Sequence, residues 1–275
     1  MNASVSELAS RVSTTRFRGA TCTESIDVVA LEEPLKLCIG GEVYTVTMRT
    51  PGHDHELAAG LLLSERLIRS GADLVRLFHC GRSEREGFGN TLNVTLAPSA
   101  RVDKDLLDLR RGTMIASACG VCGRRSIDDL LDGLSPLSGA TFRRDVLSRL
   151  TEALRAEQPG FAKTEGLHAA GIANSEGLYR VVREDIGRHN ATDKVIGRLL
   201  LDGQLPLHDC VLVVSGRTSF EIVAKALTAG IPAVVGVSAP SSLAVSTAEQ
   251  AGQLLLGFAR NGDYNVYSGA QRLET

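Results

Sequence analysis

The stretch Cys210-Val211-Leu212-Val213-Val214-Ser215-Gly216-Arg217-Thr218-Ser219 passes from five apolar residues into a short polar loop. A short, valine-rich apolar run predicts a buried strand, and the apolar spacing over residues 219–229 predicts a helix after it. Other stretches of an apolar strand followed by a polar loop and a helix stand before and after this one. We expect strands at residues 178–183, 210–215, 233–238, 253–258 and 264–267, and helices at residues 191–201, 219–229 and 241–251 between the first four. This alternation predicts a mostly parallel sheet covered by helices.

Polar loops follow three of these strands, at residues 184–190, 215–219 and 238–242. Because the carboxyl ends of parallel strands meet at one edge of a sheet, we expect a ligand there, and helix N-termini favour phosphates. Arg188, His189 and Arg217 supply cationic donors, and we group Ser215 with them. The alternative is that Ser, Thr and Asn act there only as helix N-caps. The chain contains neither GxGxxG nor a P-loop, so the sequence supports no ordinary dinucleotide or P-loop fold.

Strands dominate the front of the chain. They are predicted at residues 26–31, 35–39, 42–48, 75–80 and 91–96, with helices at residues 54–67 and 103–110. Gly40-Gly41 separates two alternating runs, which is a strong hairpin signal. Farther on, residues 142–157 have helical spacing that Pro159-Gly160 should end, and residues 167–173 and 178–183 predict a second hairpin.

We therefore predict four parts of the chain. They are a loosely held tail rich in Ser and Thr at residues 1–18, a β-rich subdomain at residues 19–112, a loop and helix at residues 113–133, and an α/β domain at residues 134–275. The expected fold class is α/β in the back half and α+β overall.

The composition is that of an ordinary globular protein. The 275 residues are 43% hydrophobic and 23% charged, with a formal net charge of −2. This charge gives no reason to expect nucleic acid or an anionic membrane as the main partner, and the apolar runs are only strand-sized. The first residues lack the pattern of a signal peptide, and six cysteines are scattered without a disulfide framework. We expect a cytoplasmic protein.

Two thiols stand three residues apart in Ser117-Ala118-Cys119-Gly120-Val121-Cys122-Gly123-Arg124-Arg125, just ahead of a predicted helix. Neighbouring cations and a helix N-terminus both lower the pKa of a thiol, which favours a nucleophilic thiolate at Cys119 or Cys122. Half of a zinc site, a redox dithiol and two incidental core thiols stay open as alternatives. A structural zinc site needs four ligands, and the chain has no second CxxC.

Histidines and carboxylates gather at His53-Asp54-His55-Glu56, where a helix is predicted to begin. This group is metal-like, but the HxE and PCxxC pattern of the zinc deaminases is absent. His168 stands in an apolar strand, and we expect a hydrogen-bonded core histidine. His208 stands in a loop beside proline and should face water.

Several strings of residues, taken in order, resemble the formate dehydrogenase accessory sulfurtransferase family (FdhD/NarQ). The resemblance covers the chain from about residue 20 to its end. The main strings are Thr50-Pro51-Gly52-His53-Asp54, Cys119-Gly120-Val121-Cys122-Gly123, Gly166-Leu167-His168-Ala169-Ala170, Val182-Arg183-Glu184-Asp185-Ile186-Gly187-Arg188-His189-Asn190-Ala191, Val214-Ser215-Gly216-Arg217, Val237-Ser238-Ala239-Pro240-Ser241-Ser242-Leu243-Ala244 and Gly257-Phe258-Ala259-Arg260.

The resemblance implies a sulfur carrier. Cys119 would receive sulfane sulfur from a cysteine desulfurase as a persulfide, with Cys122 as a helper or a dispensable partner. The sulfur would pass to the bis(molybdopterin guanine dinucleotide) molybdenum cofactor before its insertion into formate dehydrogenase. This cofactor would be a bound substrate, and neither a metal site nor a permanent cofactor is expected.

The resemblance also implies where that substrate binds and how the chain folds. The binding segment would be Phe258-Ala259-Arg260-Asn261-Gly262-Asp263, to which we add Arg188, His189, Ser215 and Arg217. The back half would be similar to the three-layer cytidine deaminase-like α/β fold without its zinc chemistry, and the working unit would be a homodimer.

Two other functions stay open. A chaperone would hold the guanylated molybdenum cofactor without covalent sulfur chemistry, and then Cys119 and Cys122 would only contact the metal. A zinc hydrolase or deaminase would use the CxxC and a histidine, which the missing zinc-deaminase pattern disfavours.

Overall fold

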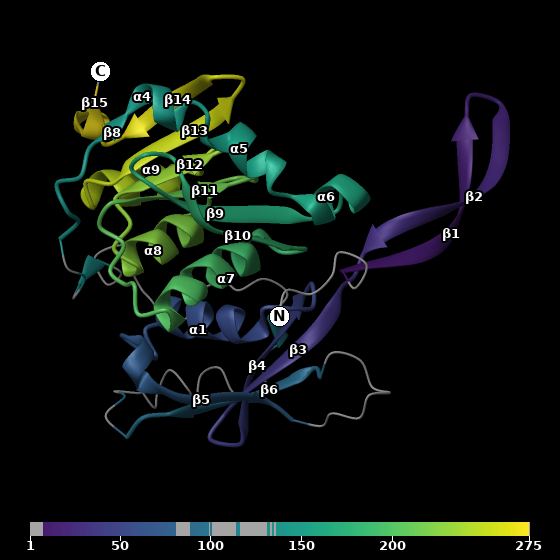
Figure 1. The fold of residues 1–275 in the computed structure, drawn as a ribbon, viewed down its shortest axis with the longest axis horizontal. Coiled ribbons are helices and arrows are strands. Elements are labelled where there is room, and N and C mark those ends of the chain that lie inside the picture. The colour runs from purple at the N-terminus through teal and green to yellow at the C-terminus, as the bar shows by residue number, and fades with distance from the viewer. Residues whose placement is uncertain are drawn as a thin grey trace.

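The computed structural model describes residues 8–80, 89–98, 100, 131–132, 134 and 136–274, and the backbone alone of residues 114 and 115. In this part of the chain a six-stranded and a five-stranded sheet are joined through helices, and a long hairpin leaves the body (Figure 1). The predicted mixed α/β class is confirmed.

The six-stranded sheet has the strand order β10-β9-β11-β12-β13-β14. Its members are β9 (His168–Asn174), β10 (Tyr179–Asp185), β11 (Cys210–Val214), β12 (Ala233–Gly236), β13 (Leu254–Arg260) and β14 (Asp263–Ser268). β11, β12 and β13 are parallel, whereas β9 and β14 run antiparallel to their neighbours. The strands β10, β11, β12 and β13 therefore run in one direction, as predicted, whereas the prediction of a parallel sheet was wrong for β14, and β9 runs against its two neighbours. A hairpin signal predicts that β9 and β10 pair, but not that β9 joins β11.

Helices cover both faces of this sheet. The helices α7 (Arg188–Leu201), α8 (Phe220–Thr228) and α9 (Ser242–Gln250) lie on one face, and α4 (Arg144–Leu147) and α5 (Leu150–Ala156) lie on the other. In β11, Leu212 packs with the first layer and Val213 with the second. Burial on both faces explains why this strand is apolar at every position.

Residues 142–157, which were predicted as one helix, are divided between several elements. Phe142–Arg143 form β8, and α4 and α5 follow it. β8 pairs with β15 (Leu273–Glu274), the last strand of the chain, which comes directly after the short helix η3 (Ala270–Arg272). Pro159 does not end a helix but begins α6 (Pro159–Thr164). A proline at the first helical position loses no hydrogen bond, because that N–H has no partner within the helix.

The five-stranded sheet lies on the far side of helix α1 (Asp54–Ser64), which separates it from α7 (Figure 1). Its order is β5-β6-β3-β4-β7. The strands are β3 (Glu33–Ile39), β4 (Glu42–Arg49), β5 (Leu74–His79), β6 (Thr91–Leu96) and β7 (Met114–Ile115), with η2 (Gly71–Asp73) before β5. The predicted β3–β4 hairpin is confirmed, and Gly40 and Gly41 both have positive φ at its turn.

Helices α1 and α7 cross where each carries a glycine. A Cβ atom at Gly60 would overlap the backbone of Asp193, and one at Gly197 would overlap the carbonyl oxygen of Glu56. Only glycine permits two helix backbones to approach this closely, because any side chain would stand between them. This crossing fixes the five-stranded sheet and α1 against the six-stranded sheet.

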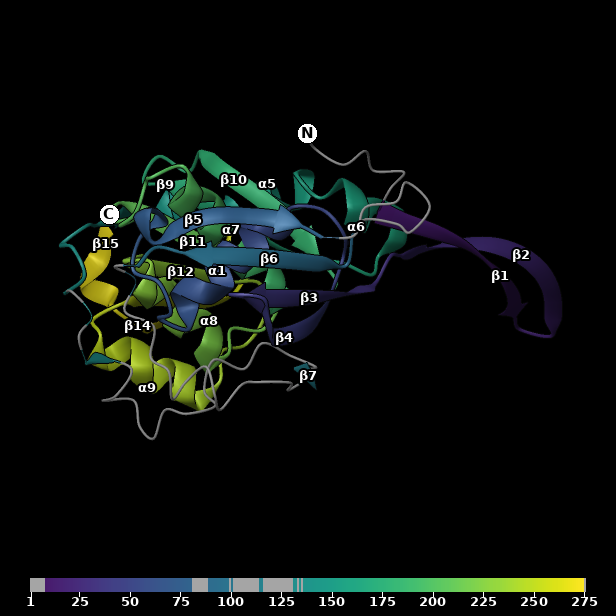
Figure 2. The same cartoon turned by 90° about the horizontal axis from the view of Figure 1, so that it is seen from below.

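β1 (Ala9–Arg18) and β2 (Thr21–Ala30) form an antiparallel hairpin that projects from the body (Figures 1 and 2). We call this hairpin the arm. Residues 9–18 were predicted as part of a loose tail, and this was wrong because they pair with β2 over their whole length. At its base, β2 contacts α6, and the Cβ atom of Ala30 lies close to Gly166.

Candidate functional site

The strands β10, β11 and β12 end at the same edge of the six-stranded sheet, as the sequence predicted. We call this edge the ligand edge. The loops that follow β11 and β12 are joined there, because the Thr218 N–H donates to the Ala239 carbonyl at 3.2 Å and the Ser241 N–H donates to the Thr218 carbonyl at 3.0 Å. β13 reaches the same place, where the Phe258 N–H donates to the Ser238 carbonyl at 3.2 Å. The polar junctions therefore form one continuous surface.

His189 links the polar loop after β10 to the polar loop after β11. Its Nε2 atom lies 3.1 Å from the Ser219 Oγ atom, at the start of α8. His189 is 7% exposed, and burial together with the cations Lys225 and Arg188 lowers its pKa to about 4. A neutral imidazole at physiological pH therefore links α7 to α8 without adding charge to the edge.

Positive charge at the ligand edge comes from Arg188 and Arg217. Burial lowers the pKa of His168, and these two guanidinium groups, lying near the ring, lower it further. Among the described residues neither arginine makes an ion pair, and the buried Nε atom of Arg188 has no hydrogen-bond partner. Unpaired guanidinium groups beside two neutral histidines favour an anionic ligand, and the planar fork of arginine matches phosphate oxygens.

A pocket of about 600 Å³ opens at the same edge, on the α5 side of the sheet. Four of the predicted site residues line it, namely Ser215, Ala259, Arg260 and Asn261. Its other walls come from α5, from α6 and from the residues that lead into β9. The structure thus brings the loop after β11 together with the end of β13 and the turn that follows it.

The remaining predicted residues lie around this pocket rather than in it. Phe258 is 38% exposed and has a φ of 54°, at an irregularity in the pairing of β13 with β14. Gly262 and Asp263 are exposed at the turn between these strands. Arg188, His189 and Arg217 are outside the pocket lining and lie by the loops of the ligand edge.

His168 was expected to be a core residue, but it lines the pocket and is about half buried. It is the first residue of β9. Because β9 runs antiparallel to β11, its first residue lies at the ligand edge, and the Ala169 N–H donates to the Ser215 Oγ atom at 2.9 Å. The predicted hairpin of residues 167–173 with residues 178–183 already implies this position, because the start of β9 pairs with the end of β10 (His168 with Asp185). The prediction of the hairpin was not combined with that of the edge.

The residues just before Arg188 hold other segments in place. Arg183 binds both carboxylate oxygens of Glu56 in α1, at 2.6 and 2.9 Å. Glu184 accepts the N–H groups of Gly160 and Phe161 at the start of α6, at 2.8 and 2.7 Å. Burial raises the pKa of this carboxyl group. The sequence did not predict that this string positions both α1 and a wall of the pocket.

Asp185 is fully buried and joins the two sheets. Its carboxylate pairs with the Lys194 ammonium at 2.7 Å and accepts the Thr50 N–H at 3.2 Å, just after β4. Asn190 donates from its Nδ2 atom to Asp185 at 3.0 Å and to the Met48 carbonyl at 2.8 Å. The end of β4 is therefore fixed directly beside the ligand edge.

The carboxylates among the residues His53-Asp54-His55-Glu56, at the start of α1, bind arginines of the same chain. The Arg49 guanidinium binds both carboxylate oxygens of Asp54, at 2.9 and 3.0 Å, and Glu56 is held by Arg183. His53 lies 3.5 Å from Glu56, and His55 stacks on His79. Within the described ranges, no group of three or more His, Cys, Asp or Glu residues is arranged to hold a metal ion.

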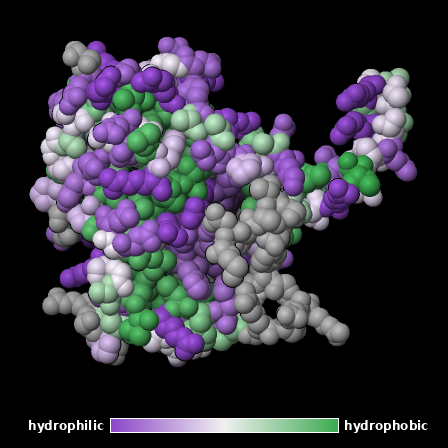
Figure 3. Space-filling model, viewed as in Figure 1, coloured by the Kyte–Doolittle hydropathy of each residue, from purple (hydrophilic) through white to green (hydrophobic). Residues whose placement is uncertain are grey.

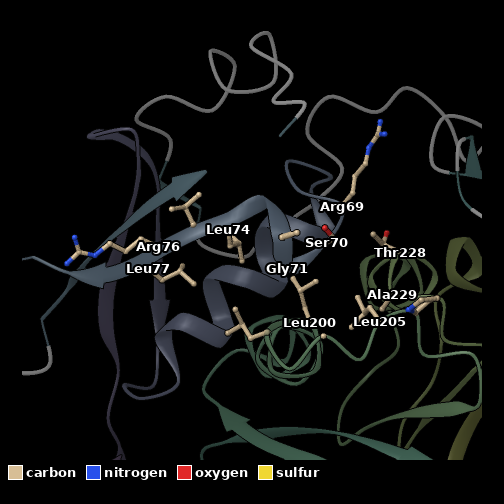
Figure 4. A pocket seen from close by; sticks show the side chains of 15 residues that line it. Arg69, Ser70, Gly71, Leu74, Arg76, Leu77, Leu200, Leu205, Thr228 and Ala229 are labelled. Atoms are coloured by element: carbon tan, nitrogen blue, oxygen red, sulfur yellow. The ribbon is translucent and has the colours of Figure 1, made fainter. Parts of the chain in front are cut away.

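A second cavity of about 680 Å³ lies between β5 and the C-terminal ends of α7 and α8 (Figure 4). Leu74, Leu77 and Leu200 line it, whereas the side chains of Arg69 and Arg76 extend away from its centre (Figure 4). It contains none of the predicted site residues. We therefore take the pocket at the ligand edge as the candidate site, although it is slightly smaller.

The predicted reactive thiols, Cys119 and Cys122, lie outside the described residues. The nearest described backbone before them is β7, which pairs in parallel with β4 through Val46↔Met114 and Thr47↔Ile115. The described cysteines are distributed between the core and the surface: Cys38 and Cys210 are buried, whereas Cys22 and Cys80 are exposed. No helix in the described part of the chain is long and apolar enough to cross a membrane.

Comparisons with known proteins agree with the sequence resemblance. A model of the FdhD/NarQ family matches residues 30–274. The sulfur carrier protein FdhD of Corynebacterium efficiens is 46% identical over 248 residues, which cover 88% of this chain and 90% of the relative. The sulfur carrier protein FdhD of Nocardia farcinica is 47% identical over 252 residues, covering 90% and 89%.

One solved structure has the same overall fold. It is the crystal structure of a formate dehydrogenase accessory protein from Desulfotalea psychrophila, with a TM-score of 0.76 and 22% sequence identity. The match covers 97% of this chain and 100% of that one. At this identity the likeness concerns the fold alone.

Proposed function

The chain belongs to the FdhD/NarQ family, and from this we propose that it is a sulfur carrier in the maturation of formate dehydrogenase. A cysteine desulfurase donates sulfane sulfur to Cys119, and the resulting persulfide sulfur is delivered to a bis(molybdopterin guanine dinucleotide) molybdenum cofactor. In the loading step the Cys119 thiolate attacks the outer sulfur of the donor persulfide. A new S–S bond forms, the old one breaks, and the thiolate of the desulfurase is released.

The ligand edge is the observation that carries this proposal. The cofactor presents pyrophosphate groups, which need unpaired cationic donors and free N–H groups. Arg188 and Arg217 provide such donors, and the loops after β11 and β12 lead into the starts of α8 and α9. The adjoining pocket of about 600 Å³ has room for part of a nucleotide. No resident metal or permanent cofactor enters this proposal.

The short stretch of sequence between the described residue Ile115 and Cys119 supports delivery of sulfur to the ligand edge. Cys119 follows Ile115 by four residues in the sequence, so their Cα atoms are at most about 14 Å apart. Ile115 pairs with Thr47, and the next residue, Met48, accepts a hydrogen bond from Asn190 beside the ligand edge. The described chain that leads toward Cys119 therefore ends beside β4, next to the ligand edge.

Sulfur loading tests the carrier role directly. After incubation with a cysteine desulfurase and cysteine, the peptide that contains Cys119 should gain one sulfur atom, and a thiol reductant should remove it. Cys119→Ala should gain none, whereas Cys22→Ala, at an exposed thiol on the arm, should load like the parent protein. Peptide mass spectrometry provides the measurement. If an active desulfurase adds no sulfur to Cys119 or Cys122, a non-covalent cofactor chaperone is the better proposal.

Nucleotide binding tests the ligand edge separately from the thiol. We use guanosine diphosphate, which carries the guanosine and a pyrophosphate of the proposed cofactor. Arg188→Gln should weaken its binding by about tenfold to a hundredfold, because one charge-assisted hydrogen bond contributes roughly 1.5–3 kcal/mol. Isothermal titration calorimetry at fixed ionic strength gives the affinity.

The matched control is Arg180→Gln. Arg180 belongs to β10, the strand that leads into the loop before Arg188, but it lies near the start of that strand, away from the ligand edge, and pairs with Asp209 at 3.0 Å. Its replacement should leave the affinity for guanosine diphosphate unchanged. Equal affinities of Arg188→Gln and the parent protein would remove Arg188 from the site.

A further inference from the structure

The hairpin of β13 and β14 carries at its tip residues 258–263, the segment that the family resemblance implies for cofactor binding. Arg260 pairs with Asp263, and the two residues between them, Asn261 and Gly262, have φ values of 53° and 84°. An Asn-Gly pair is the preferred sequence for a two-residue hairpin turn with positive φ angles, so the local sequence accounts for the shape of this turn. Hydrophilic residues cover the tip, near the top of the view in Figure 3.

The local sequence does not fix where this tip lies relative to the rest of the fold. The pairing of β13 with β14 is irregular between Gly257 and Arg260, and Phe258 within this stretch has a φ of 54°. An irregularity of this kind interrupts the ladder of hydrogen bonds that would otherwise join the tip to the sheet. The position of the tip therefore depends on contacts with other elements.

Glu152 of α5 makes such a contact, and α5 lies beside this hairpin (Figure 1). Its Oε1 atom accepts the Asn261 N–H at 2.6 Å, and its Oε2 atom accepts the Thr151 hydroxyl at 3.1 Å. Within the described ranges, no other side chain hydrogen-bonds to the backbone of residues 258–263. Glu152 therefore joins the tip of the hairpin to the helix that forms one wall of the pocket.

The surroundings of Glu152 favour its charged, hydrogen-bond-accepting form. Burial opposes ionisation of this carboxyl group, but its own N–H and the N–H groups of Asn261 and Gly262 outweigh burial and lower its pKa. The side chain is exposed, and it makes no ion pair with the residues that the structure describes. Because an exposed side chain contributes little to the core, replacing Glu152 should affect the position of the turn more than the stability of the fold.

The contact lies directly at the candidate site. Glu152, Arg260 and Asn261 all line the pocket at the ligand edge, and Ser215 and His168 line it as well. A shift of the turn would therefore move the part of the lining that comes from β13 relative to the part that comes from β9 and the loop after β11. A binding site needs its residues fixed within about 0.5 Å of the productive arrangement.

We propose that Glu152 is a positioning residue, which fixes the Asn261-Gly262 turn against α5 and thereby holds the binding segment in the arrangement that takes the nucleotide. The inference rests on the proposed nucleotide site at the ligand edge, and it gives Glu152 no part in the sulfur chemistry. The hydrogen bond, and not the negative charge, has this effect. A glutamine at this position should therefore replace the glutamate, because its carbonyl oxygen can accept the same N–H.

Guanosine diphosphate is the probe for the first test. Glu152→Ala should weaken its binding about tenfold, because the turn loses its contact with α5. Glu152→Gln should bind it within about threefold of the parent value. Isothermal titration calorimetry gives the affinities. The melting temperatures of both variants should stay within about 2 °C of the parent protein, since surface substitutions change stability little.

The matched control is Glu157→Ala. Glu157 is an exposed glutamate directly after α5 and lies outside the lining of the pocket. Its replacement removes the same carboxylate charge from the same region of the protein, and it should leave the affinity for guanosine diphosphate unchanged.

Hydrogen exchange gives a second measurement that needs no ligand. In Glu152→Ala the Asn261 amide loses its acceptor, so the peptide that contains residues 258–263 should exchange faster than in the parent protein. In Glu152→Gln and Glu157→Ala this peptide should exchange at the parent rate. A peptide from β11 provides the internal reference, because the change should be confined to the turn.

Three results would overturn the proposal. Glu152→Ala could bind guanosine diphosphate as tightly as the parent protein. The peptide that contains residues 258–263 could exchange at an unchanged rate in this variant. Glu152→Gln could bind as weakly as Glu152→Ala, which would make the charge the cause. A parent protein that binds no guanosine diphosphate would instead overturn the proposed ligand edge, whereas the exchange rates would still show whether Glu152 fixes the turn.

Discussion

Gly197→Ala is expected to lower the free energy of unfolding by about 3 kcal/mol and the melting temperature by about 6–12 °C. The new methyl group would overlap the Glu56 carbonyl oxygen and lie 2.6 Å from the Gly60 nitrogen. Helices α1 and α7 would have to separate, which would loosen the contact between the two sheets. Differential scanning calorimetry and urea denaturation measure the loss.

The sign of this effect separates packing from helix propensity. Alanine is favoured over glycine in a helix by roughly 0.5–1 kcal/mol, so propensity alone predicts a more stable variant. Gly139→Ala is the control, because a Cβ atom there has no neighbour within 4 Å. Gly60→Ala should behave like Gly197→Ala, since its Cβ atom would overlap the Asp193 backbone. An unchanged or higher melting temperature for both helix variants would contradict the close crossing.

Lys225→Met is expected to destabilise the protein by about 3–5 kcal/mol near pH 7, because it leaves a buried carboxylate without its cation. The Lys225 ammonium lies 2.7 and 2.8 Å from the two carboxylate oxygens of Asp193, and Asp193 is fully buried. Burial raises the pKa of Asp193, and Lys225 opposes that rise. Without Lys225 the pKa of the folded state must rise further above the unfolded value of about 3.9.

The pH dependence of this loss follows from linkage. A carboxyl group whose pKa is higher in the folded state favours folding while it is protonated, and this contribution disappears as the pH rises through the folded-state pKa. The variant should therefore lie closest to the parent protein in acid and lose relative stability toward neutral pH. Urea denaturation from pH 5 to pH 8 measures the difference between the two proteins.

A double variant provides the control for this ion pair. Asp193→Asn/Lys225→Met removes both charges and should recover most of the stability that Lys225→Met loses, since no unpaired charge remains buried. The Ser64 hydroxyl, which donates to Asp193 at 3.0 Å, can still donate to the asparagine carbonyl oxygen. A loss in Lys225→Met that does not change with pH would show that packing, not charge, is responsible.

Local patterns predicted the elements that local chemistry determines. The alternating runs on either side of Gly40-Gly41 gave the β3–β4 hairpin, and the apolar runs gave β11 and β12. The polar loops after β10, β11 and β12 were correctly placed at one edge. These features depend on residues close together in the sequence, where turn chemistry and burial on both faces leave a clear pattern.

Features that depend on distant contacts could not be predicted. Nothing near His168 indicates that β9 inserts between β10 and β11. Its place at the ligand edge follows from the predicted hairpin with β10 but was overlooked. Lys194 and Lys225 look like solvated residues of amphipathic helices, yet each is buried against an aspartate. The arm was predicted only in part. The strand expected at residues 26–31 overlaps the second half of β2, whereas β1 was missed because its largely polar residues leave no apolar alternation.

The string from Arg183 to Arg188 has a consequence for genetic studies of this protein. Arg183, Glu184 and Asp185 bind α1, α6 and Lys194, respectively, whereas Arg188, the fourth of these residues, makes no ion pair with the described part of the chain. A screen that scores growth on formate would recover substitutions at all four positions with the same phenotype. Three of them would act by reducing the amount of folded protein in the cell, so an immunoblot of steady-state abundance would sort such alleles before any is assigned to the binding site.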